Sequence, residues 1–168
     1  YNGYNKTRPA WDIAFYEQLF ASDPLLTDKS MVKGAFILSD KQMIVPDELY
    51  DNDAAEGWLR KIHFVELTDV LLHHRLEPAK TRYVMAAPVN ITELIRINFS
   101  NAPILPAPCY QLSDVPKKGG ICQCMITAEQ VSATLHQNGH LLWHHVFAHV
   151  NAEDIAYNHY ITKPVAEG

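Results

Sequence analysis

Residues 130–160, QVSATLHQNGHLLWHHVFAHVNAEDIAYNHY, decide how this chain folds. They contain Asn138-Gly139, a pair that tolerates the positive φ values that a two-residue hairpin turn requires. Alternating apolar residues precede this pair, and a nearly continuous apolar run, 141–150, follows it, as is typical of two paired strands. Asn151 can then cap a helix, with Asp154 beside the positive helix end. We therefore predict a strand, a tight turn, a strand and a helix.

A cluster of histidines in this stretch raises the question of a metal site. On a helix, residues four apart would have the spacing of zinc ligand pairs, whereas on a strand they lie about 13 Å apart, too far for one ion. The hairpin favours the strand, so we expect structural or surface histidines and no metal site. A cross-strand pair beside the turn, such as His136 with His140, remains open as an alternative, without an obvious third ligand. The cluster consists of His136, His140, His144, His145 and His149.

Composition bounds the class of protein. The chain has 168 residues, which suits one domain or two small lobes around a sizeable core. Its hydrophobic content of 48% with 20% charged residues is ordinary for a folded protein. The net charge of −5 argues against nucleic acid as the main partner, because phosphate binding needs a basic surface. No apolar run approaches the ~20 residues that span a bilayer, and no signal peptide is visible.

The chain contains three cysteines, Cys109, Cys122 and Cys124. An odd number without a recognisable framework indicates reduced thiols, so we expect a cytoplasmic protein. Cys122 and Cys124 fall two residues apart on a predicted strand and should face one side. We interpret them as two small core residues, in preference to a redox pair. Nine histidines that are neutral at pH 7 predict sensitivity to acid.

Helices and strands alternate in groups along the rest of the chain. We expect the loop Ser39–Lys41 to turn one strand back onto the next, and Asn90 to cap a helix together with Glu93. The segment SDVPKKGG, 113–120, is the best linker candidate because it is polar and contains proline and glycine. The predicted elements before it are helix 9–21, strands 31–38 and 42–45, a helical turn 46–50, helix 53–63, strands 70–76 and 82–87, a helix from Asn90 and a short strand 102–105. Such an order predicts α/β or α+β layers.

Three segments resemble a known family. FIL at 36–38 with IVPDELY at 44–50, RYVMAAP at 82–88, and HLLWHHVF at 140–147 with AEDIAY at 152–157 agree with it in order and spacing. The family is domain of unknown function 3822, an uncharacterised actin-like family of Bacteroidetes, and the resemblance covers most of 30–160. The chain departs from the family pattern around His144-His145, where histidine replaces an asparagine that precedes the phenylalanine.

The resemblance implies an α/β protein with a ribonuclease-H-like, actin-like ATPase fold. Residues 1–113 would form part of the first lobe with an inserted ββα unit, 114–120 a linker, and 121–168 the βββα start of the second lobe. The first lobe should open with a three-stranded meander before helix 9–21, and the second should continue past Lys163. We therefore expect a fragment that is incomplete at both ends.

Actin-like ATPases hold a nucleotide between two lobes, with glycine-containing turns close to the phosphates. The matching turn here, Thr127-Ala128-Glu129-Gln130, has no glycine, and only Glu129 is acidic. No P-loop or Gly-x-Gly-x-x-Gly motif occurs in the sequence, and Lys117-Lys118-Gly119-Gly120 reads as a solvated loop. We expect no cofactor. ATP with magnesium remains an alternative that would need a phosphate turn upstream.

Other catalytic patterns are equally weak. The sequence has no Gly-x-Ser-x-Gly and no His-Glu-x-x-His motif, and Glu153-Asp154 fits the positive end of a helix better than a metal. We assign no catalytic and no metal-binding residues, and leave any cofactor-binding residues unknown. Our preferred hypothesis is a non-catalytic scaffold for an unknown protein partner. The alternatives are a nucleotide-binding actin-like ATPase and a metal- or thiol-dependent enzyme that uses the histidines and cysteines.

Overall fold

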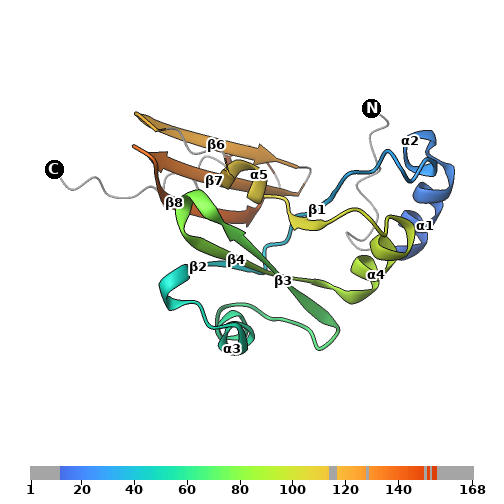
Figure 1. The fold of residues 1–168 in the computed structure, drawn as a ribbon, viewed down its shortest axis with the longest axis horizontal. Helices are drawn as coiled ribbons and strands as arrows, with labels where there is room; N and C mark the ends of the chain where they lie inside the picture. The colour runs from blue at the N-terminus through green and yellow to red at the C-terminus, as the bar shows by residue number, and fades with distance from the viewer. Residues whose placement is uncertain (1–11, 114–116, 128, 150, 152, 155–168) are drawn as a thin grey trace.

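The described part of the chain contains three separate β-sheets (Figure 1). The computed structural model describes residues 12–113, 117–127, 129–149, 151, 153 and 154. One sheet is a parallel pair, and the other two are antiparallel with three strands each. In spatial order the strands are β1 (Ala35–Ile37) and β5 (Ile104–Pro106); β2 (Gln42–Pro46), β4 (Thr81–Pro88) and β3 (Asp69–Leu76); and β6 (Gly120–Ile126), β7 (Gln130–Gln137) and β8 (His140–Ala148).

The predicted Asn-Gly hairpin is confirmed. Asn138 and Gly139 have φ values of 51° and 85°, the positive pair of a type I′ turn. Strand β8 pairs with β7 from His140 opposite Gln137 onward. Asn151 and Asp154 then bond reciprocally, since the backbone N–H of each donates to the side chain of the other at 3.3 and 2.9 Å. The predicted cap is therefore present, whereas the rest of the expected helix lies outside the described residues.

The predicted pairing of strands 70–76 and 82–87 is also confirmed, because β3 and β4 form an antiparallel hairpin over their whole length. A 3₁₀ turn, Glu77–Ala79, connects them, and Lys80 closes it in the left-handed region with φ 49°. The predicted helical turn at 46–50 exists as a second 3₁₀ turn, Asp47–Leu49. Turn residues were therefore reliable signals wherever the paired strands are neighbours in sequence.

Five helices are present in the described part of the chain, and none of them is long and apolar enough to cross a membrane. Asp12 opens the first helix by accepting a hydrogen bond from the Phe15 N–H, and the expected start at Pro9 lies outside the described residues. Asp23 ends this helix with its N–H and opens the next with its carboxylate, which accepts from Leu25 at 2.8 Å. The helices are α1 (Ile13–Ser22), α2 (Pro24–Thr27), α3 (Asn52–Ile62), α4 (Val89–Asn98) and α5 (Cys109–Ser113).

The predicted hairpin between strands 31–38 and 42–45 is wrong. Strand β1 is only three residues long and pairs in parallel with β5, whereas β2 pairs with β4. The loop between them does not reverse the chain into a ladder, because the carbonyl of Lys41 accepts a hydrogen bond from the Ala86 N–H of β4 at 2.9 Å. Both true partners lie far away in the sequence, so local turn residues carried no information about them.

The predicted capping role of Asn90 is wrong as well. Helix α4 begins at Val89, after Pro88, so Asn90 already lies inside its first turn. The Asn90 side chain accepts only from the adjacent Ile91 N–H, and Glu93 bonds Arg96 at 2.6 Å. Helix α5 was not predicted, since three prolines in 103–108 made this stretch read as irregular.

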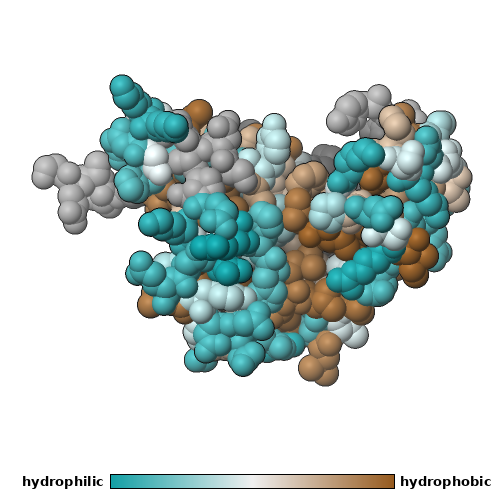
Figure 2. All heavy atoms as spheres, viewed as in Figure 1, coloured by the Kyte–Doolittle hydropathy of each residue, from teal (hydrophilic) through white to brown (hydrophobic). Residues whose placement is uncertain are grey.

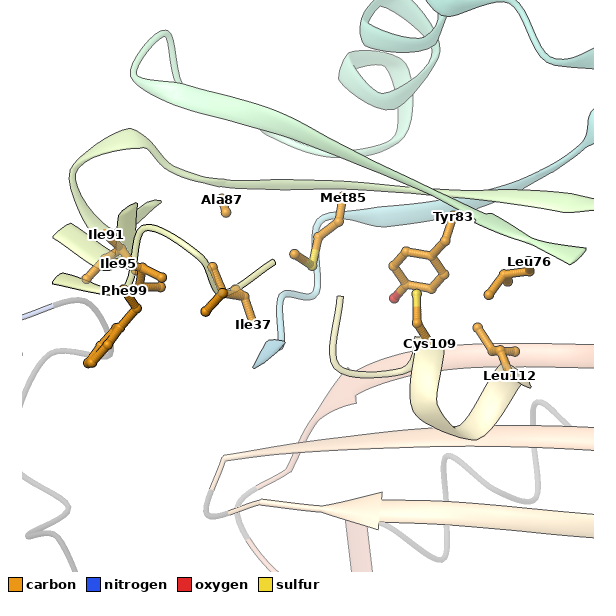
Figure 3. Packing of buried hydrophobic residues seen from close by; sticks show 11 residues of the cluster. Ile37, Leu76, Tyr83, Met85, Ala87, Ile91, Ile95, Phe99, Cys109 and Leu112 are labelled. Atoms are coloured by element: carbon orange, nitrogen blue, oxygen red, sulfur yellow. The ribbon is translucent and has the colours of Figure 1, made fainter. Parts of the chain in front are cut away.

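The core lies on both faces of β4. Tyr83, Met85 and Ala87 point toward α4, α5 and β1, as Figure 3 shows, and are at most 1% exposed. Val84 and Ala86 point the other way and pack against α3. Figure 2 shows further hydrophobic surface between strands β3–β4 and helices α1 and α4. Strand β4 therefore contributes alternate side chains to two hydrophobic clusters, one on each face of its sheet.

The turn geometry predicts opposite effects for two glycine-to-alanine changes. Gly139→Ala should destabilise the fold by about 1–2 kcal/mol, because an alanine is strained at φ 85°. The matched control Gly57→Ala, on the exposed side of α3 with open space around it, should stabilise by about 0.5–1 kcal/mol. Urea unfolding measures both changes. A Gly139→Ala protein as stable as the parent would contradict the type I′ turn.

Candidate functional site

A cleft of about 580 Å³ lies between helices α1, α2 and α4, residues 34–41, and the turn that connects β6 to β7. Its volume is within the range of small-ligand sites. Most of the wall is apolar, and its polar residues come from two segments, the loop after β1 and the β6–β7 turn. These polar residues are Ser39, Asp40, Lys41, Thr127, Glu129 and Gln130.

The β6–β7 turn is the one that the resemblance identifies with a phosphate turn. The Thr127 hydroxyl accepts hydrogen bonds from the N–H groups of Glu129 and Gln130 at 3.4 and 3.0 Å and donates to the Gln130 carbonyl. The carbonyl of Glu129 accepts from the His149 N–H at 3.0 Å. These two N–H groups, which a phosphate would need, therefore already have partners inside the turn.

The charges in the cleft lining are also unfavourable for phosphate. Asp40 and Glu129 of the lining are exposed, and its single lysine, Lys41, bonds the buried Asp69 carboxylate at 2.8 Å. Burial raises the pKa of Tyr16, and the negative charges of Asp12 and Glu129 raise it further. An anionic ligand would meet carboxylates and a neutralised lysine.

Four of the five histidines of the cluster lie on strands, as predicted, and His149 follows the end of β8. His136 is opposite Leu141, and His140 is opposite Gln137, so the cross-strand pair left open at the turn is not directly opposed. His140 and His145 are exposed, and the His149 ring lies 3.0 Å from the Thr127 carbonyl. Among the described residues, no group of three His, Cys, Asp or Glu side chains could hold a metal ion.

His144 joins two of the sheets. Its Nδ1 lies 3.0 Å from the Thr134 hydroxyl of β7 and its Nε2 3.5 Å from the Tyr83 hydroxyl of β4, with the two rings edge to face at 5.6 Å. Burial, and to a smaller extent the neighbouring His145 and His136, lower the pKa of His144 to about 3. The neutral imidazole is therefore part of the packing between sheet β2-β4-β3 and sheet β6-β7-β8.

Cys109 lies in the same core as Tyr83 and is 3% exposed. Burial raises the pKa of its thiol to about 12. A cysteine nucleophile needs a thiolate beside a basic histidine, whereas this region holds a protonated thiol and an imidazole of lowered basicity. The described geometry does not favour Cys109 with His144 as a nucleophile pair.

The interpretation of Cys122 and Cys124 as core residues is wrong, because both are exposed. They share one side of β6, as predicted, but β6 is an edge strand of its sheet and five of its seven residues are exposed. Burial and the neighbouring thiol of Cys122 raise the pKa of Cys124. A strand pattern alone could not distinguish an edge strand from a central one.

Two further segments singled out in the sequence lie away from the cleft lining. Gly119 bonds Asn138 through both backbone groups, so the basic glycine pair of 117–120 supports the hairpin turn. Asp154 caps its own helix start. The sequence did not identify Ser39–Lys41 as cleft residues. A polar triplet directly after an apolar strand is the signal that could have done so.

The partly buried His144 predicts a loss of stability in mild acid. Because its folded pKa is about 3 and its ordinary value about 6.5, the unfolded chain takes up the proton first, and stability falls as pH decreases through that window. His144→Gln should flatten the pH dependence by up to about 1.4 kcal/mol per pH unit, measured by urea unfolding between pH 7 and 5. The same change at exposed His140 is the control. Equal slopes for the parent and His144→Gln would refute this role.

Comparison with known proteins agrees with this architecture. A crystal structure from Bacteroides thetaiotaomicron VPI-5482, described as a protein with an actin-like ATPase fold and unknown function, superposes with a TM-score of 0.75 at 15% sequence identity. The match covers 89% of this chain and 60% of that chain, so the chain has an actin-like ATPase fold and spans less than two thirds of the solved protein. No curated protein matches. The family model for protein of unknown function (DUF3822) matches residues 5–163, and the chain therefore belongs to that family.

Proposed function

We propose that this chain is a non-catalytic actin-like module that works as a protein-interaction scaffold with a degenerate nucleotide site. The observation that carries the proposal is the β6–β7 turn. The N–H groups of Glu129 and Gln130 in this turn already donate hydrogen bonds to the Thr127 hydroxyl. The turn also has no glycine that would let a phosphate approach the backbone. One fold can carry many functions, so the likeness of this chain to an actin-like ATPase fold is not evidence that it hydrolyses ATP.

Exposed apolar side chains support the binding half of the proposal. Phe64 and Leu67, in the loop between α3 and β3, are 83% and 95% exposed. Large apolar side chains that stay in water near one another are typical of surfaces that bind other proteins. The three free thiols fit a reducing compartment, so we place this scaffold in the cytoplasm. We also retain the division at 114–120 between a first-lobe part and a second-lobe part.

The two alternatives have less support. A nucleotide-binding ATPase would need donors for phosphate, whereas the described cleft lining exposes the carboxylates of Asp40 and Glu129. A thiol-dependent enzyme would need a thiolate, whereas burial raises the pKa of Cys109 to about 12. Neither alternative accounts for the hydrogen bonds between the Thr127 hydroxyl and the N–H groups of Glu129 and Gln130 within the β6–β7 turn.

The proposal predicts that Mg-ATP does not stabilise the protein. In a thermal melt of the complete reading frame, millimolar Mg-ATP should leave the midpoint unchanged within about 1 °C. A nucleotide bound at 100 times its dissociation constant would add about 2.7 kcal/mol, or roughly 5–10 °C for a protein of this size. A nucleotide-binding actin-like protein serves as the positive control. A shift of several degrees, or measurable release of phosphate, would overturn the degenerate-site proposal.

A further inference from the structure

One face of β7, the central strand of its sheet, carries a row of buried polar side chains. Ser132, Thr134 and His136 alternate along the strand and are at most 1% exposed. The opposite face carries Val131 and Ala133, which belong to a separate hydrophobic cluster. Polar side chains inside a protein are informative because they need hydrogen-bond partners, and these partners show what the polar face of β7 contacts.

Ser132 connects this face to helix α5. Its hydroxyl donates to the side-chain oxygen of Gln111 at 2.7 Å, and the Gln111 side-chain nitrogen lies 3.4 Å from the Ser132 carbonyl, to which it donates. Both residues are buried. Helix α5 is part of the core built on β4, since Cys109 and Leu112 point from it into the cluster of Tyr83 (Figure 3). The Gln111–Ser132 pair therefore connects sheet β6-β7-β8 to that core.

His144 provides the second connection. Its ring lies between the Thr134 hydroxyl of its own sheet at 3.0 Å and the Tyr83 hydroxyl of β4 at 3.5 Å. A neutral imidazole has one N–H donor and one acceptor nitrogen, so it can bond both hydroxyls at once. In the described part of the chain, Leu141 is the one residue of sheet β6-β7-β8 that packs against the hydrophobic cluster of Tyr83. Hydrogen bonds and little shared hydrophobic core therefore connect the two sheets.

The kind of contact decides whether the two sheets can move relative to each other. Interfaces within a chain that are small or polar permit relative motion by default. Hydrogen bonds away from water oppose such motion, because they are directional and a displaced partner would be left unpaired in a medium of low dielectric constant. A single connection would act as a pivot, whereas connections at two separate places restrict the angle. We call the two connections, Gln111–Ser132 and Tyr83–His144, the inter-sheet links.

We propose that the two inter-sheet links set the angle between sheet β2-β4-β3 and sheet β6-β7-β8, so that the protein keeps one shape without a bound nucleotide. Loss of either link lets the two sheets turn relative to each other while each sheet stays folded. This inference rests on the proposed scaffold function and names the device that holds the scaffold in shape. A partner that contacts both sheets would then meet a surface that is already arranged for binding.

The test measures the distance between the two sheets by double electron–electron resonance on the complete reading frame. Spin labels are attached through unnatural ketone amino acids that replace Lys61 of α3 and Cys122 of β6, which are both exposed. Helix α3 packs against sheet β2-β4-β3 through Leu59, so this pair of labels reports the angle between the two sheets. The parent protein should give one narrow distance distribution.

Each link has its own variant. Tyr83→Phe keeps the buried ring and removes the hydroxyl that lies beside His144. Gln111→Leu combined with Ser132→Ala replaces both partners of the other link by apolar groups, which leaves neither side chain unpaired. Either variant should raise the population outside the parent distance about two- to tenfold, the range of one hydrogen bond. Thermal melts verify that the variants fold.

The chain offers a matched control for each kind of change. Tyr50→Phe also removes a hydroxyl that bonds a histidine edge to face, since Tyr50 lies 2.6 Å from Nδ1 of His73, but both residues belong to the side of sheet β2-β4-β3. Thr92→Val removes a hydroxyl as buried as that of Ser132, whose bond to the Val89 carbonyl stays within α4. Neither control should change the distance distribution.

Three results would overturn the proposal: a broad distribution in the parent, link variants with the distribution of the parent, or controls that broaden it as much as the link variants do. If one link variant does not fold, the other decides, because the links lie on different elements. A parent distance that changes with millimolar Mg-ATP would instead overturn the degenerate nucleotide site. Failure of the proposed function and failure of the inter-sheet links are therefore distinguishable.

Discussion

Burial of β4 on both of its faces is the constraint on which the rest of the structure depends. Tyr83, Met85 and Ala87 lie in one hydrophobic cluster, and Val84 and Ala86 in the other, each at most 1% exposed. A shift of one residue would exchange the two sets, so the register of β4 is strongly specified. That register fixes β2 and β3 beside it, α3 on one side, and His144 of β8 through Tyr83.

Under the proposed function, the cleft keeps the place of a ligand while its chemistry has changed. Three parts of the chain still meet there, but the hydroxyl of Thr127 supplies within the turn what a phosphate would supply from outside. The exposed carboxylates of Asp40 and Glu129 in the lining are unfavourable for an anionic ligand. Geometry shared across a fold therefore does not determine which ligand a given member binds.

The sequence predicted the elements whose signals are local. The Asn138-Gly139 turn, the β3–β4 hairpin and α3 depend on turn residues and short-range periodicity, and all are present. The pairing of β1 with β5 was missed because its partner lies about seventy residues away, beyond the reach of any local pattern. Exposure of Cys122 and Cys124 depends on β6 being an edge, which is a property of the sheet. The cleft was missed for the same reason, since distant segments build it.

Asp23 has a consequence for how the first helices move. Its N–H bonds the Leu19 carbonyl at the end of α1, and its carboxylate bonds the Leu25 N–H at the start of α2. The Phe20 ring packs on Phe99 at 4.9 Å, and Leu26 joins the same cluster. Because one residue serves both helices, neither end can fray without releasing the other. We therefore expect α1 and α2 to keep a fixed angle to each other, without a hinge at Asp23. When this part of the protein unfolds locally, both helices should unfold together.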